Sequence, residues 1–453
     1  MSNSSKLSAR DRLCTLLDDN SFVEIGKLVT KRNTDFNLQT KEAPSDGVIT
    51  GYGTINDCPV YVFAQDASVM NGTIGEMHAK KIVNIYDLAL KVGAPVIGLY
   101  DCAGLRLEEA TDALEGLGAI MAKQAEAAGI IPQIAVVLGT CGGGLSVSAS
   151  MCDFVFASEE GKLFINTPNA VKNNNVDKCD TASAEFKAQN GAVDVTCKTE
   201  EEVLNSVRQL VSLIPGNLDE AAPEADTTDD LNRETPELAA VIDDGAKALS
   251  VISDDNFFFE IKQGFAKEMV IGFIKLDGVT VGAIANRAAV LDDNGKAVET
   301  FGNALTVEGV RKALNFVYFC DSFDIPVLTL TNVSGFGSCI CQERRLALPL
   351  AKLAAAFANA DIAKVNLITG KAIGSAYTIM NSKALGADMV FALDTAKIGP
   401  MEAELEAQIT GTDAKAVADA QGAEMAAKRG YVDSIIDAAS ARKNLVYAFE
   451  MLY

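Results

Sequence analysis

The 453-residue sequence has few of the side chains from which most acid–base and metal sites are built. It contains one histidine, His78, and no tryptophan. A single imidazole excludes mechanisms that need a histidine pair, and it excludes most zinc sites, which use several histidines or clustered cysteines. We therefore expect no metal site. Proton transfer must involve other groups, and a bound cofactor is one source of them.

Positive charge is also scarce. The 39 Lys and Arg residues are outnumbered by 61 Asp and Glu residues, which gives a net charge of −22. Nucleic acids and anionic membranes bind to dense positive charge, so we expect no nucleic-acid partner. An anionic small ligand would need a local basic patch, and Lys80, Lys81 and Arg106 are the first places to look for one.

Regular cysteine spacing is absent. The ten cysteines form no CxxC motif, and a chain of this length does not need disulfides for stability. We expect reduced, mostly buried thiols, as in a cytosolic protein. The polar N-terminal stretch MSNSSKLSARDRL has no apolar core, which predicts that there is no signal peptide.

One uncharged stretch, residues 127–152, is long enough to cross a membrane. Its middle, however, is Gly139-Thr-Cys-Gly-Gly-Gly144, and the run before it, residues 134–138, is rich in β-branched side chains. We interpret the stretch as a buried strand, a glycine turn and a buried helix.

The chain is predicted to hold two domains, residues 1–216 and 238–453. Between them, residues 217–237 are rich in acidic side chains and contain two prolines, a composition typical of a solvated linker. Within each half, strands alternate with helical stretches of about 10 to 15 residues, which predicts an α/β domain with a largely parallel sheet.

The two halves also resemble each other, which predicts an internal duplication. A pair of strands at residues 53–64 matches one at 272–283. Three further matches are each 231 residues apart: Pro95 with Pro326, Gly104 with Gly335, and the segment 139–143 with 370–374.

Glycine turns are the best candidates for chemistry. Thr140-Cys-Gly-Gly-Gly-Leu145 lies between an expected strand and an expected helix, where glycine allows positive φ and leaves N–H groups free to bind an oxyanion. Alternatively, the turn serves only to pack the helix on the sheet. Gly374-Ser-Ala-Tyr377 holds the matching place in the second half, which predicts two equivalent anion cradles. The sequence has no GxxxxGK[ST] motif and no complete dinucleotide fingerprint.

Charged residues near strand ends are further candidates. Asp101-Cys-Ala-Gly-Leu-Arg106 follows a strand, where ligands bind in α/β sheets, and Arg106 could hold a phosphate or carboxylate. The plainer alternatives are a surface arginine at 106, a structural histidine at 78, and lysines 80 and 81 on a solvated helix face.

Seven segments spread over nearly the whole chain carry a family resemblance. They are SARDRLCTLLDDNSFVEI (8–25), PSDGVITGYGTI (44–55), GTIGEMHAKKI (72–82), APVIGLYDCAGLRLEE (94–109), GTCGGGLSVSASMCDF (139–154), FCDSFDIPVLTL (319–330) and GKAIGSAYTIMNSKALGAD (370–388). Together they resemble the carboxyltransferase subunits of biotin-dependent acyl-CoA carboxylases and decarboxylases. The resemblance implies a tandem duplication of a crotonase/ClpP-like (ββα superhelix) domain, the first copy binding coenzyme A and the second binding biotin.

The resemblance also implies a mechanism that suits a chain with one histidine. Carboxybiotin releases CO2, the ureido nitrogen takes the α-proton of the acyl-CoA, and the enolate attacks CO2. The protein then needs only N–H donors for two oxyanions. In that family the active site lies at a dimer interface, between the first domain of one protomer and the second of another.

Residue roles follow from the matched positions. Gly143 and Gly144 would face the thioester oxygen, and Ser375 and Ala376 the biotin ureido oxygen. The other implied contacts are, on the CoA side, Lys80, Asp101, Gly104, Arg106 and Gly142, and on the biotin side, Gly335, Phe336, Gly374 and Tyr377. Departures from the family pattern, such as Thr378 in place of an Asp and Cys102-Ala103 in place of glycines, leave the acyl chain open.

We therefore expect a carboxyltransferase subunit that moves a carboxyl group between a malonyl-, methylmalonyl- or propionyl-type acyl-CoA and biotin on a separate biotin carboxyl carrier protein. Its expected partners are biotin carboxylase or membrane decarboxylase subunits, with a weak preference for a decarboxylase or transcarboxylase setting. We expect a homo-oligomer, either a dimer or a trimer of dimers, in the cytoplasm or at the periphery of a membrane decarboxylase complex. The alternatives are a crotonase-type acyl-CoA hydrolase or isomerase that uses Glu108 or Glu109 without biotin, and a scaffold whose second site has decayed.

Overall fold

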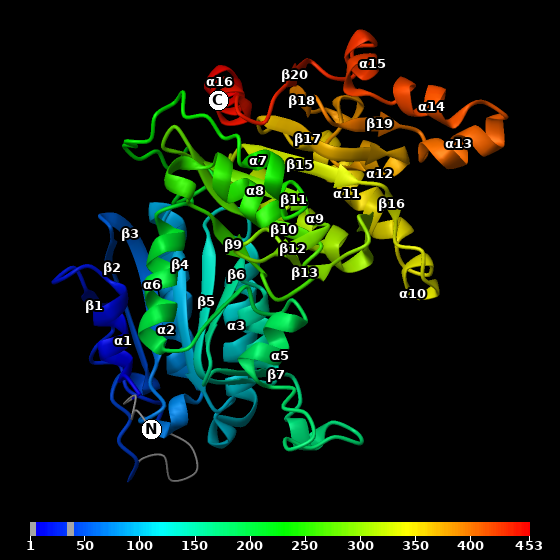
Figure 1. Cartoon of the computed structure of the whole chain (residues 1–453). Coiled ribbons are helices and arrows are strands. Elements are labelled where there is room, and N and C mark those ends of the chain that lie inside the picture. The colour runs from blue at the N-terminus through cyan, green and yellow to red at the C-terminus, as the bar shows by residue number, and fades with distance from the viewer. Residues whose placement is uncertain (1–5, 34–39) are drawn as a thin grey trace. The chain divides into compact units, whose positions relative to one another are not determined.

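The structure is a computed structural model that describes residues 6–33 and 40–453 (Figure 1). The chain forms two compact units, Met1–Glu220 and Ala221–Tyr453. Each unit is built around one large mixed sheet, and we describe each by itself.

The first unit contains the following elements in chain order: α1 (Ala9–Leu16), β1 (Val23–Ile25), η2 (Ser45–Gly47), β2 (Val48–Ile55), β3 (Cys58–Gln65), η3 (Met70–Gly72), α2 (Glu76–Val92), β4 (Val96–Cys102), η4 (Leu107–Glu109), α3 (Ala110–Ala127), β5 (Gln133–Gly142), α4 (Gly144–Ser150), β6 (Phe154–Ser158), β7 (Lys162–Phe164), η5 (Pro168–Ala170), α5 (Ala184–Gln189), β8 (Val195–Cys197) and α6 (Glu200–Val211).

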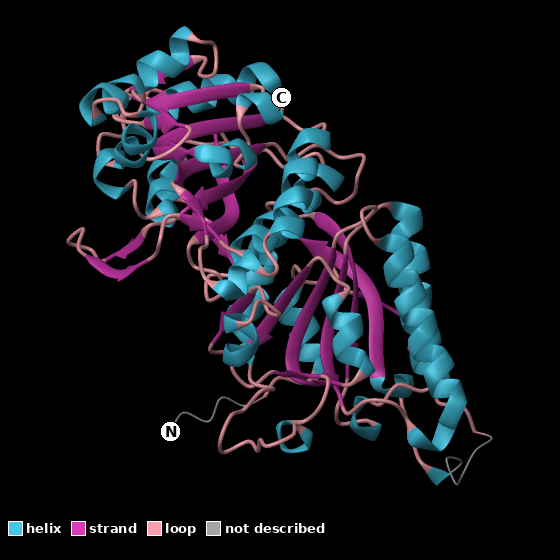
Figure 2. Ribbon diagram, turned by 90° about the vertical axis from the view of Figure 1, so that its right-hand side faces the viewer, coloured by secondary structure: helices cyan, strands magenta, loops and turns pink. Residues whose placement is uncertain are grey.

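The strands of the first unit pair in the order β1-β2-β3-β4-β5-β6-β8, and β7 pairs with the end of β5. β1 to β3 are antiparallel, and the pairs from β3 onward are parallel. β4 and most of β5 are buried, as parallel strands covered on both faces must be. α2 and α3 pack together over the sheet, while α1 and α6 form a second contacting pair. Figure 2 shows helices beside the strands of both sheets.

The second unit contains α7 (Leu238–Val241), α8 (Gly245–Ile252), η6 (Asp254–Asn256), β9 (Phe259–Ile261), β10 (Met269–Leu276), β11 (Val279–Asn286), β12 (Ala289–Leu291), β13 (Ala297–Thr300), β14 (Ala304–Leu305), α9 (Val307–Ser322), β15 (Val327–Val333), β16 (Gly335–Phe336), α10 (Ile340–Glu343), α11 (Ala347–Asn359), β17 (Lys364–Ile373), α12 (Gly374–Ile379), η7 (Lys383–Leu385), β18 (Met389–Leu393), β19 (Lys397–Gly399), α13 (Ala403–Thr410), α14 (Ala414–Ala420), α15 (Ala423–Lys428), β20 (Ser434–Ile436) and α16 (Ala441–Leu452).

The second sheet repeats the first. Its strands pair in the order β9-β10-β11-β15-β17-β18-β20, with β19 on the end of β17, which is the order and direction of the first sheet from β1 to β8. Both sheets shift register near the end of the fourth strand, at Tyr100/Cys102 and at Thr331/Val333. The predicted duplication of an α/β domain is confirmed.

The acidic stretch 217–237 has no helix or strand, and most of its side chains are exposed. Within the second unit, however, part of it is held in place. Thr235 is fully buried, and its hydroxyl donates to the carbonyl of Ala438. Arg442 donates to the carbonyl of Asp230 at 2.7 Å. Residues 221–237 therefore pack onto the second unit and differ from a freely solvated linker.

The uncharged stretch 127–152 forms the end of α3, then β5, a glycine turn and α4. This is the buried strand, turn and helix that the sequence predicts. Over residues 6–33 and 40–453, no helix is long and apolar enough to span a bilayer. The first five residues of the polar N-terminal stretch lie outside the described residues.

The cysteines only partly follow the expectation of reduced, buried thiols. Cys102, Cys141 and Cys320 are free and buried. Cys339 and Cys341 are exposed and joined in a disulfide, so the prediction is wrong for this pair. The pair lies in the loop that follows β15 and β16, where composition alone gives no indication of pairing.

Candidate active site

The glycine turn of the first unit joins β5 to α4. Gly143 precedes the helix with φ +60° and ψ −132°, a conformation that side chains with a Cβ rarely adopt. The space that a Cβ at Gly143 would enter is open, with no other group within 4 Å. As the first residue of α4, Gly144 has an N–H group with no partner inside the helix. The turn thus leaves a backbone donor beside open space.

This open space belongs to a cavity of about 290 Å³ in the first unit. Two backbone segments form part of its wall, residues 103–105 and 142–145, and the side chains of Ile74, Leu117 and Phe164 supply apolar surface. The predicted residues Gly104, Gly142, Gly143 and Gly144 are therefore brought together in one cavity. An apolar wall with backbone donors suits a thioester better than a free carboxylate.

Not every N–H group in this cavity is available. Gly143 donates to the carbonyl of Phe164 at 2.8 Å, because β7 continues alongside β5 up to the turn. The donor role predicted for Gly143 is therefore excluded in this conformation, and its part is to shape the turn. The N–H of Gly104 lies 3.3 Å from the sulfur of Cys102, a weak acceptor that a stronger one could replace. Gly144 and Gly104 are the available donors.

Arg106 does not bind an external anion, and that prediction is wrong. Its side chain is fully buried between two buried carboxylates, Asp46 at 2.6 Å and Glu109 at 2.8 Å. It also donates to the carbonyl of Thr73 at 2.8 Å. Asp46 lies 60 positions earlier in the chain, so no local pattern reveals this partner. Arg106 instead fixes the segments on either side of Ile74 and Gly104 that line the cavity.

Asp101 also has a structural position, which contradicts its predicted contact with CoA. Its carboxylate pairs with Lys6 at 2.7 Å and with Arg12 at 3.0 Å, and it accepts the N–H of Thr140 at 3.4 Å. Burial raises the pKa of Asp101, but Lys6 and Arg12 outweigh that effect and keep the pKa below its usual value. A Cβ on Gly139 would lie 1.9 Å from this carboxylate. Asp101 therefore ties β4 to β5 just before the glycine turn.

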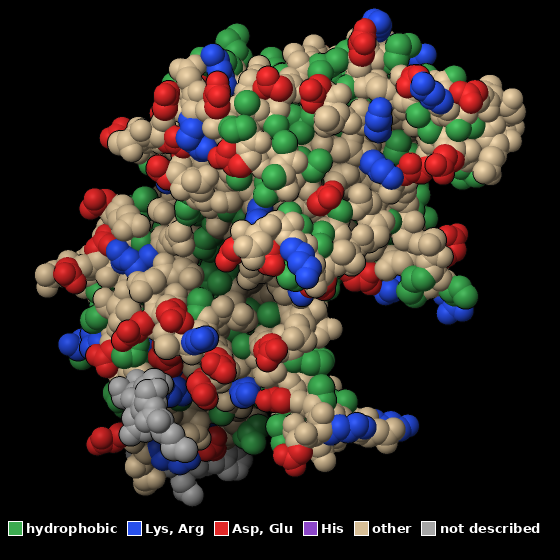
Figure 3. Space-filling view, viewed as in Figure 1, with side chains coloured by type: hydrophobic (Ala, Val, Ile, Leu, Met, Phe, Trp, Pro, Cys, Tyr) green, Lys and Arg blue, Asp and Glu red, His purple; other side chains and the backbone are tan. Residues whose placement is uncertain are grey.

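The expected basic patch is not formed by Lys80, Lys81 and Arg106. Lys80 pairs with Glu76 at 2.6 Å, in a groove between α2 and α3 that also contains Asp112. Lys81 is buried and donates to the backbone carbonyls of Ser45 and Val48, and burial lowers its pKa to about 8. Basic and acidic side chains are interspersed over the face drawn in Figure 3. Lys80 therefore belongs to a different groove from the glycine cavity.

His78 is a core residue, as its plainer interpretation predicted. It is completely buried, with Nδ1 3.0 Å from the carbonyl oxygen of Asp46 and Nε2 3.3 Å from the amide nitrogen of Gln65. Burial lowers the pKa of His78 to about 3. The imidazole is neutral at ordinary pH and does not line the glycine cavity.

The second glycine turn joins β17 to α12. Gly374 has φ +66°, close to the value at Gly143, and begins a helix whose first N–H groups lack partners inside the helix. These include Ser375, which is exposed, and Ala376, whose side chain is buried. Tyr377 follows on the same helix and packs against the core; burial raises its pKa to about 12.

The short strand β16 brings the remaining predicted biotin residues to the same place. Gly335 and Phe336 pair with Ala304 and Leu305, and β16 lies beside α12. Phe336 is 37% exposed, which leaves an aromatic ring accessible next to the second turn. The structure thus groups Gly335, Phe336, Gly374 and Tyr377 around one helix start.

The sequence analysis missed the counterpart of Asp101 in the second unit. Asn332 lies 231 residues after Asp101, and its side-chain oxygen accepts the N–H of Lys371 at 3.0 Å, as Asp101 does for Thr140. A Cβ on Gly370 would lie 2.7 Å from that oxygen. The constant offset between the two halves was the signal that could have revealed it.

Comparisons with known proteins point to one family. The carboxyl transferase domain family matches residues 2–453. The chain is 37% identical to the propionyl-CoA carboxylase beta chain of Roseobacter denitrificans, with 99% of this chain and 91% of that one covered. It is 35% identical to the methylmalonyl-CoA decarboxylase alpha subunit of Propionigenium modestum, over 99% and 90% of the two chains.

Among solved structures, transcarboxylase 12S with hydrolysed methylmalonyl-coenzyme A bound superposes with a TM-score of 0.92 at 32% identity, covering 99% of this chain and 89% of that one. That protein assembles as a hexamer. A single-chain long-chain acyl-CoA carboxylase, with a TM-score of 0.81 at 21% identity, shares the fold. The crotonase-like fold expected from the resemblance is confirmed.

Proposed function

The chain belongs to the carboxyl transferase family, and from that premise we propose that it moves a carboxyl group between an acyl-CoA and biotin held on a separate carrier protein. One observation carries the proposal. Two topologically identical units each place a positive-φ glycine, Gly143 or Gly374, between a central strand and a helix start. A transfer between two carbonyl compounds needs two oxyanion sites, and the duplication supplies them.

The first turn would hold the acyl-CoA. Gly144 and Gly104 line the cavity, where their backbone N–H groups can stabilise the negative charge on the thioester oxygen as the α-carbon becomes an enolate, once the N–H of Gly104 exchanges the sulfur of Cys102 for that oxygen. Backbone donors fixed by the sheet need no reorganisation when that charge develops. Leu117 and Phe164 exclude water from the wall, which protects the enolate from protonation by solvent.

The second turn would hold biotin. The N–H groups of Ser375 and Ala376 have no partner inside α12, and Gly374 keeps the space before them free of a side chain. A neutral ureido oxygen fits such a pair of donors, and the accessible ring of Phe336 offers an apolar surface beside them. When bound, biotin supplies the carboxyl group and a basic ureido nitrogen. The one histidine of the chain, His78, is buried and does not line the glycine cavity.

The acyl group is proposed to be short. A cavity of about 290 Å³ with Leu117 and Phe164 in its wall is at the small end for ligand sites and suits a malonyl-, methylmalonyl- or propionyl-type group. Methylmalonyl-CoA is the ligand in the transcarboxylase 12S structures. CoA itself needs basic contacts, and Arg106 is not among them.

The proposed partners are a biotin carboxyl carrier protein and either a biotin carboxylase or membrane decarboxylase subunits. Relatives from both settings match at similar identity, 37% and 35%, so the same site serves either direction. We propose a homo-oligomer, as a dimer or a trimer of dimers, because the hexameric neighbour matches the whole chain. We place it in the cytoplasm, at the membrane periphery if its partner is a decarboxylase.

The test is an exchange assay of malonyl-, methylmalonyl- and glutaconyl-CoA with free biotin. Gly143→Val should lower exchange by roughly 100-fold or more, because the side chain would enter the thioester space and the helix start would shift. Gly295→Val is the matched control: Gly295 also has positive φ, at +75°, with no group within 4 Å, but it lies in an exposed turn between β12 and β13. Equal exchange rates in the two variants would contradict the assignment.

The biotin-independent hydrolase or isomerase is disfavoured by the positions of its proposed bases. Glu109 is buried against Arg106 and accepts the N–H of Glu76, while Glu108 pairs with Lys41. Neither lines the glycine cavity. Turnover of an acyl-CoA by the purified chain without biotin would reinstate it. A scaffold with a decayed second site would bind CoA but show no binding when titrated with a biotinylated carrier.

A further inference from the structure

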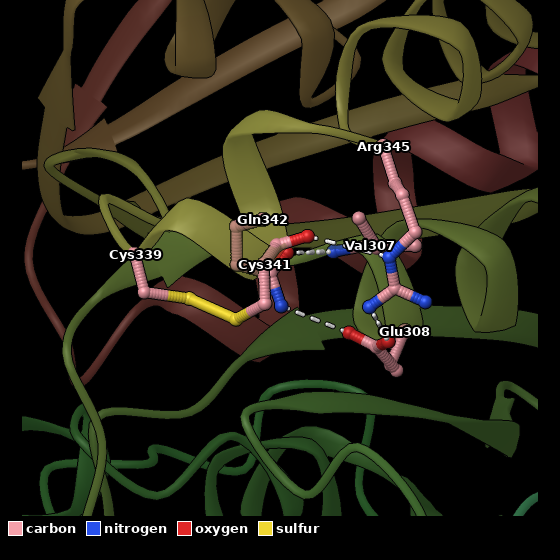
Figure 4. The surroundings of a disulfide bond; sticks show 6 residues. All are labelled: Val307, Glu308, Cys339, Cys341, Gln342 and Arg345. Carbon is pink, nitrogen blue, oxygen red and sulfur yellow. Dashed lines mark hydrogen bonds and ion pairs between the residues drawn. A yellow bond between two sulfur atoms is a disulfide. The ribbon is translucent and has the colours of Figure 1, made fainter.

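The loop after β15 carries an exposed disulfide beside the proposed biotin site. Cys339 and Cys341 are joined two positions apart, three residues after Phe336 (Figure 4). Both cysteines are exposed, and Ile340 between them is 73% exposed. A bond so close to a binding loop and so open to solvent is accessible to thiol reagents.

The matching loop of the first unit is held very differently. There the buried Arg106 and its two carboxylates anchor residues 103–109. The position equivalent to Arg106, 231 residues later, is Gly337, which has no side chain to form such an anchor. Both loops nevertheless make the same backbone hydrogen bond: Arg106 donates to the carbonyl of Ile74, and Gly337 to that of Leu305.

A single side chain, Gln342, replaces the buried network in the second unit. In the first unit, Glu109 accepts the first N–H of α2, from Glu76, at 2.6 Å. In the second unit, Gln342 accepts the first N–H of α9, from Val307, also at 2.6 Å. Gln342 is only half-buried and donates in turn to Glu308 at 2.9 Å, as Figure 4 shows. The loop position therefore depends on where Gln342 is held.

Gln342 lies on α10, a helix of four residues. A turn of this length is unstable in water by itself, because its nucleation cost is not repaid by many further hydrogen bonds. Here the carbonyl of Gln342 also accepts the N–H groups of Arg345 and Leu346, both at 2.9 Å, which continue the turn only as far as the start of α11. Cys339 precedes the helix and accepts the N–H groups of Gln342 and Glu343 at 3.0 Å through its carbonyl, while Cys341 lies within the turn. The disulfide thus crosslinks the single turn that presents Gln342.

We propose that Cys339 and Cys341 form a reversible thiol–disulfide modification site, reduced by dithiols, whose state sets the order of the loop carrying Gly335 and Phe336. The disulfide holds α10 and Gln342 in place, and reduction releases them. The consequence for biotin binding rests on the function proposed above, whereas the modification itself does not.

The chemistry balances with a dithiol reductant. One reductant thiolate attacks a cysteine sulfur, the bond between Cys339 and Cys341 breaks, and a mixed disulfide forms with release of the other cysteine as a thiol. The second reductant thiol then displaces the remaining cysteine. Two electrons and two protons pass from the reductant, which leaves as a disulfide, to the two cysteines. A disulfide oxidant such as oxidised glutathione reverses both steps.

The other thiols are poor competitors for this reaction. Burial raises the pKa of Cys102 to about 11 and also raises the pKa of Cys152, which leaves little thiolate at either position. Cys14 and Cys58 are exposed but carry no disulfide. They therefore serve as accessible control thiols.

The first experiment tests the site without reference to activity. The full chain is treated with oxidised glutathione or with dithiothreitol, alkylated, and analysed by peptide mass spectrometry. In parallel, each sample is cleaved briefly with trypsin, which can cut after the exposed Arg344 and Arg345 directly behind α10. We expect alkylation of Cys339 and Cys341 only after reduction, and cleavage at Arg344 and Arg345 several-fold faster in the reduced chain. Labelling that is equal in both states, or cleavage that is unchanged, would overturn the proposal.

The second experiment tests the consequence. Exchange is measured for the oxidised chain, the reduced chain, Cys341→Ser and the control Cys14→Ser. Reduction and Cys341→Ser should each raise the KM for biotin roughly three- to tenfold and leave the KM for acyl-CoA unchanged, because only the second loop loses its order. Cys14→Ser should match the unmodified chain in each state. An equal rise in both KM values would refute the local effect. Absence of exchange in every sample, with Cys339 and Cys341 still alkylated only after reduction, would refute the proposed function and leave the modification site standing.

Discussion

The loops that follow β4 and β15 hold the same backbone position by different means. In the first unit the anchor is a charged network with no solvent exposure, centred on Arg106. In the second unit it is the half-buried Gln342 on a single turn closed by a disulfide. After duplication, the positive-φ glycines and the strand register have stayed alike, whereas the side chains that support them have diverged.

This difference separates what the chemistry requires from what stability requires. The donors at the two helix starts are backbone groups, so any residues that keep β5 and β17 in register will preserve them. The supporting residues are free to vary, and they set how rigid each site is. The first site is fixed by buried charge, and the second can respond to its surroundings.

The largest contrast is expected when the two anchors are removed. Arg106→Met leaves the buried carboxylates of Asp46 and Glu109 without a partner and should cost about 3–5 kcal/mol of unfolding free energy. Gln342→Ala removes only partly exposed hydrogen bonds and should cost about 1 kcal/mol. Urea unfolding of both variants measures the difference.

Arg106→Lys is the control for charge alone. It retains a positive charge but cannot reach Asp46, Glu109 and Thr73 together, so its stability should fall between those of the unmodified chain and Arg106→Met. If Arg106→Met and Gln342→Ala unfold at the same urea concentration, the two anchors contribute equally to stability, and the first loop is not held more firmly than the second.

The next contrast exchanges the equivalent residues at the strand ends. Asn332→Asp places a carboxylate at a buried position beside Asp243, an exposed residue whose carboxylate lies 3.2 Å from the amide nitrogen of Asn332, and should cost about 2–3 kcal/mol. Asp101→Asn keeps the acceptor for Thr140 and loses the ion pairs with Arg12 and Lys6. Because Arg12 still has Glu200, we expect the smaller cost of about 1 kcal/mol.

The two exchanges should also differ in their dependence on pH. The folded-state pKa of Asp101 lies below its unfolded value, so its contribution is present above about pH 4 and is lost as the pH falls toward the folded pKa. The unmodified chain should therefore lose stability relative to Asp101→Asn on acidification. The carboxyl group that Asn332→Asp introduces beside Asp243 should have a raised pKa, because two like charges lie close together, so acid should relieve its penalty. Parallel pH profiles for both variants would contradict this assignment.

A smaller effect is expected from closing the space beside these residues. Gly139→Ala would bring a Cβ to 1.9 Å from the Asp101 carboxylate, and Gly370→Ala to 2.7 Å from the Asn332 amide. Both should destabilise the protein by roughly 1–3 kcal/mol, the first by more. Adding Asn332→Ala to Gly370→Ala should recover part of the loss, as thermal unfolding would show. No recovery would mean that the contact with Asn332 is not the cause.

The sequence predicted the features that are local or repeated. The alternation of strands and helices and the constant offset between the halves predicted the duplication, the strand before Gly139 and both glycine turns. It failed where the deciding partner lies far along the chain: Asp101 and Arg106 follow a strand end as ligand-binding residues do, but Arg12 and Asp46 neutralise them. The hydrogen bond from the N–H of Gly143 to Phe164 was likewise not predictable from the sequence, because it depends on where β7 pairs.

The smallest effect on activity is expected at His78, the one histidine of the chain. His78 packs behind the first site, and burial lowers its pKa to about 3, so its single imidazole NMR signal should not titrate between pH 5 and 8. Because the unfolded chain binds this proton near pH 6.5, stability should decline below that pH toward pH 3. The His78→Gln variant should catalyse exchange between acyl-CoA and biotin at nearly the normal rate across pH 6 to 8, because the ring contacts neither glycine turn. The opposite outcome would be an imidazole that titrates near pH 6.5 and a matching limb in the pH–rate profile that His78→Gln abolishes. That outcome would place a proton-transfer group in the first site, and the two sites would then not work through backbone donors alone.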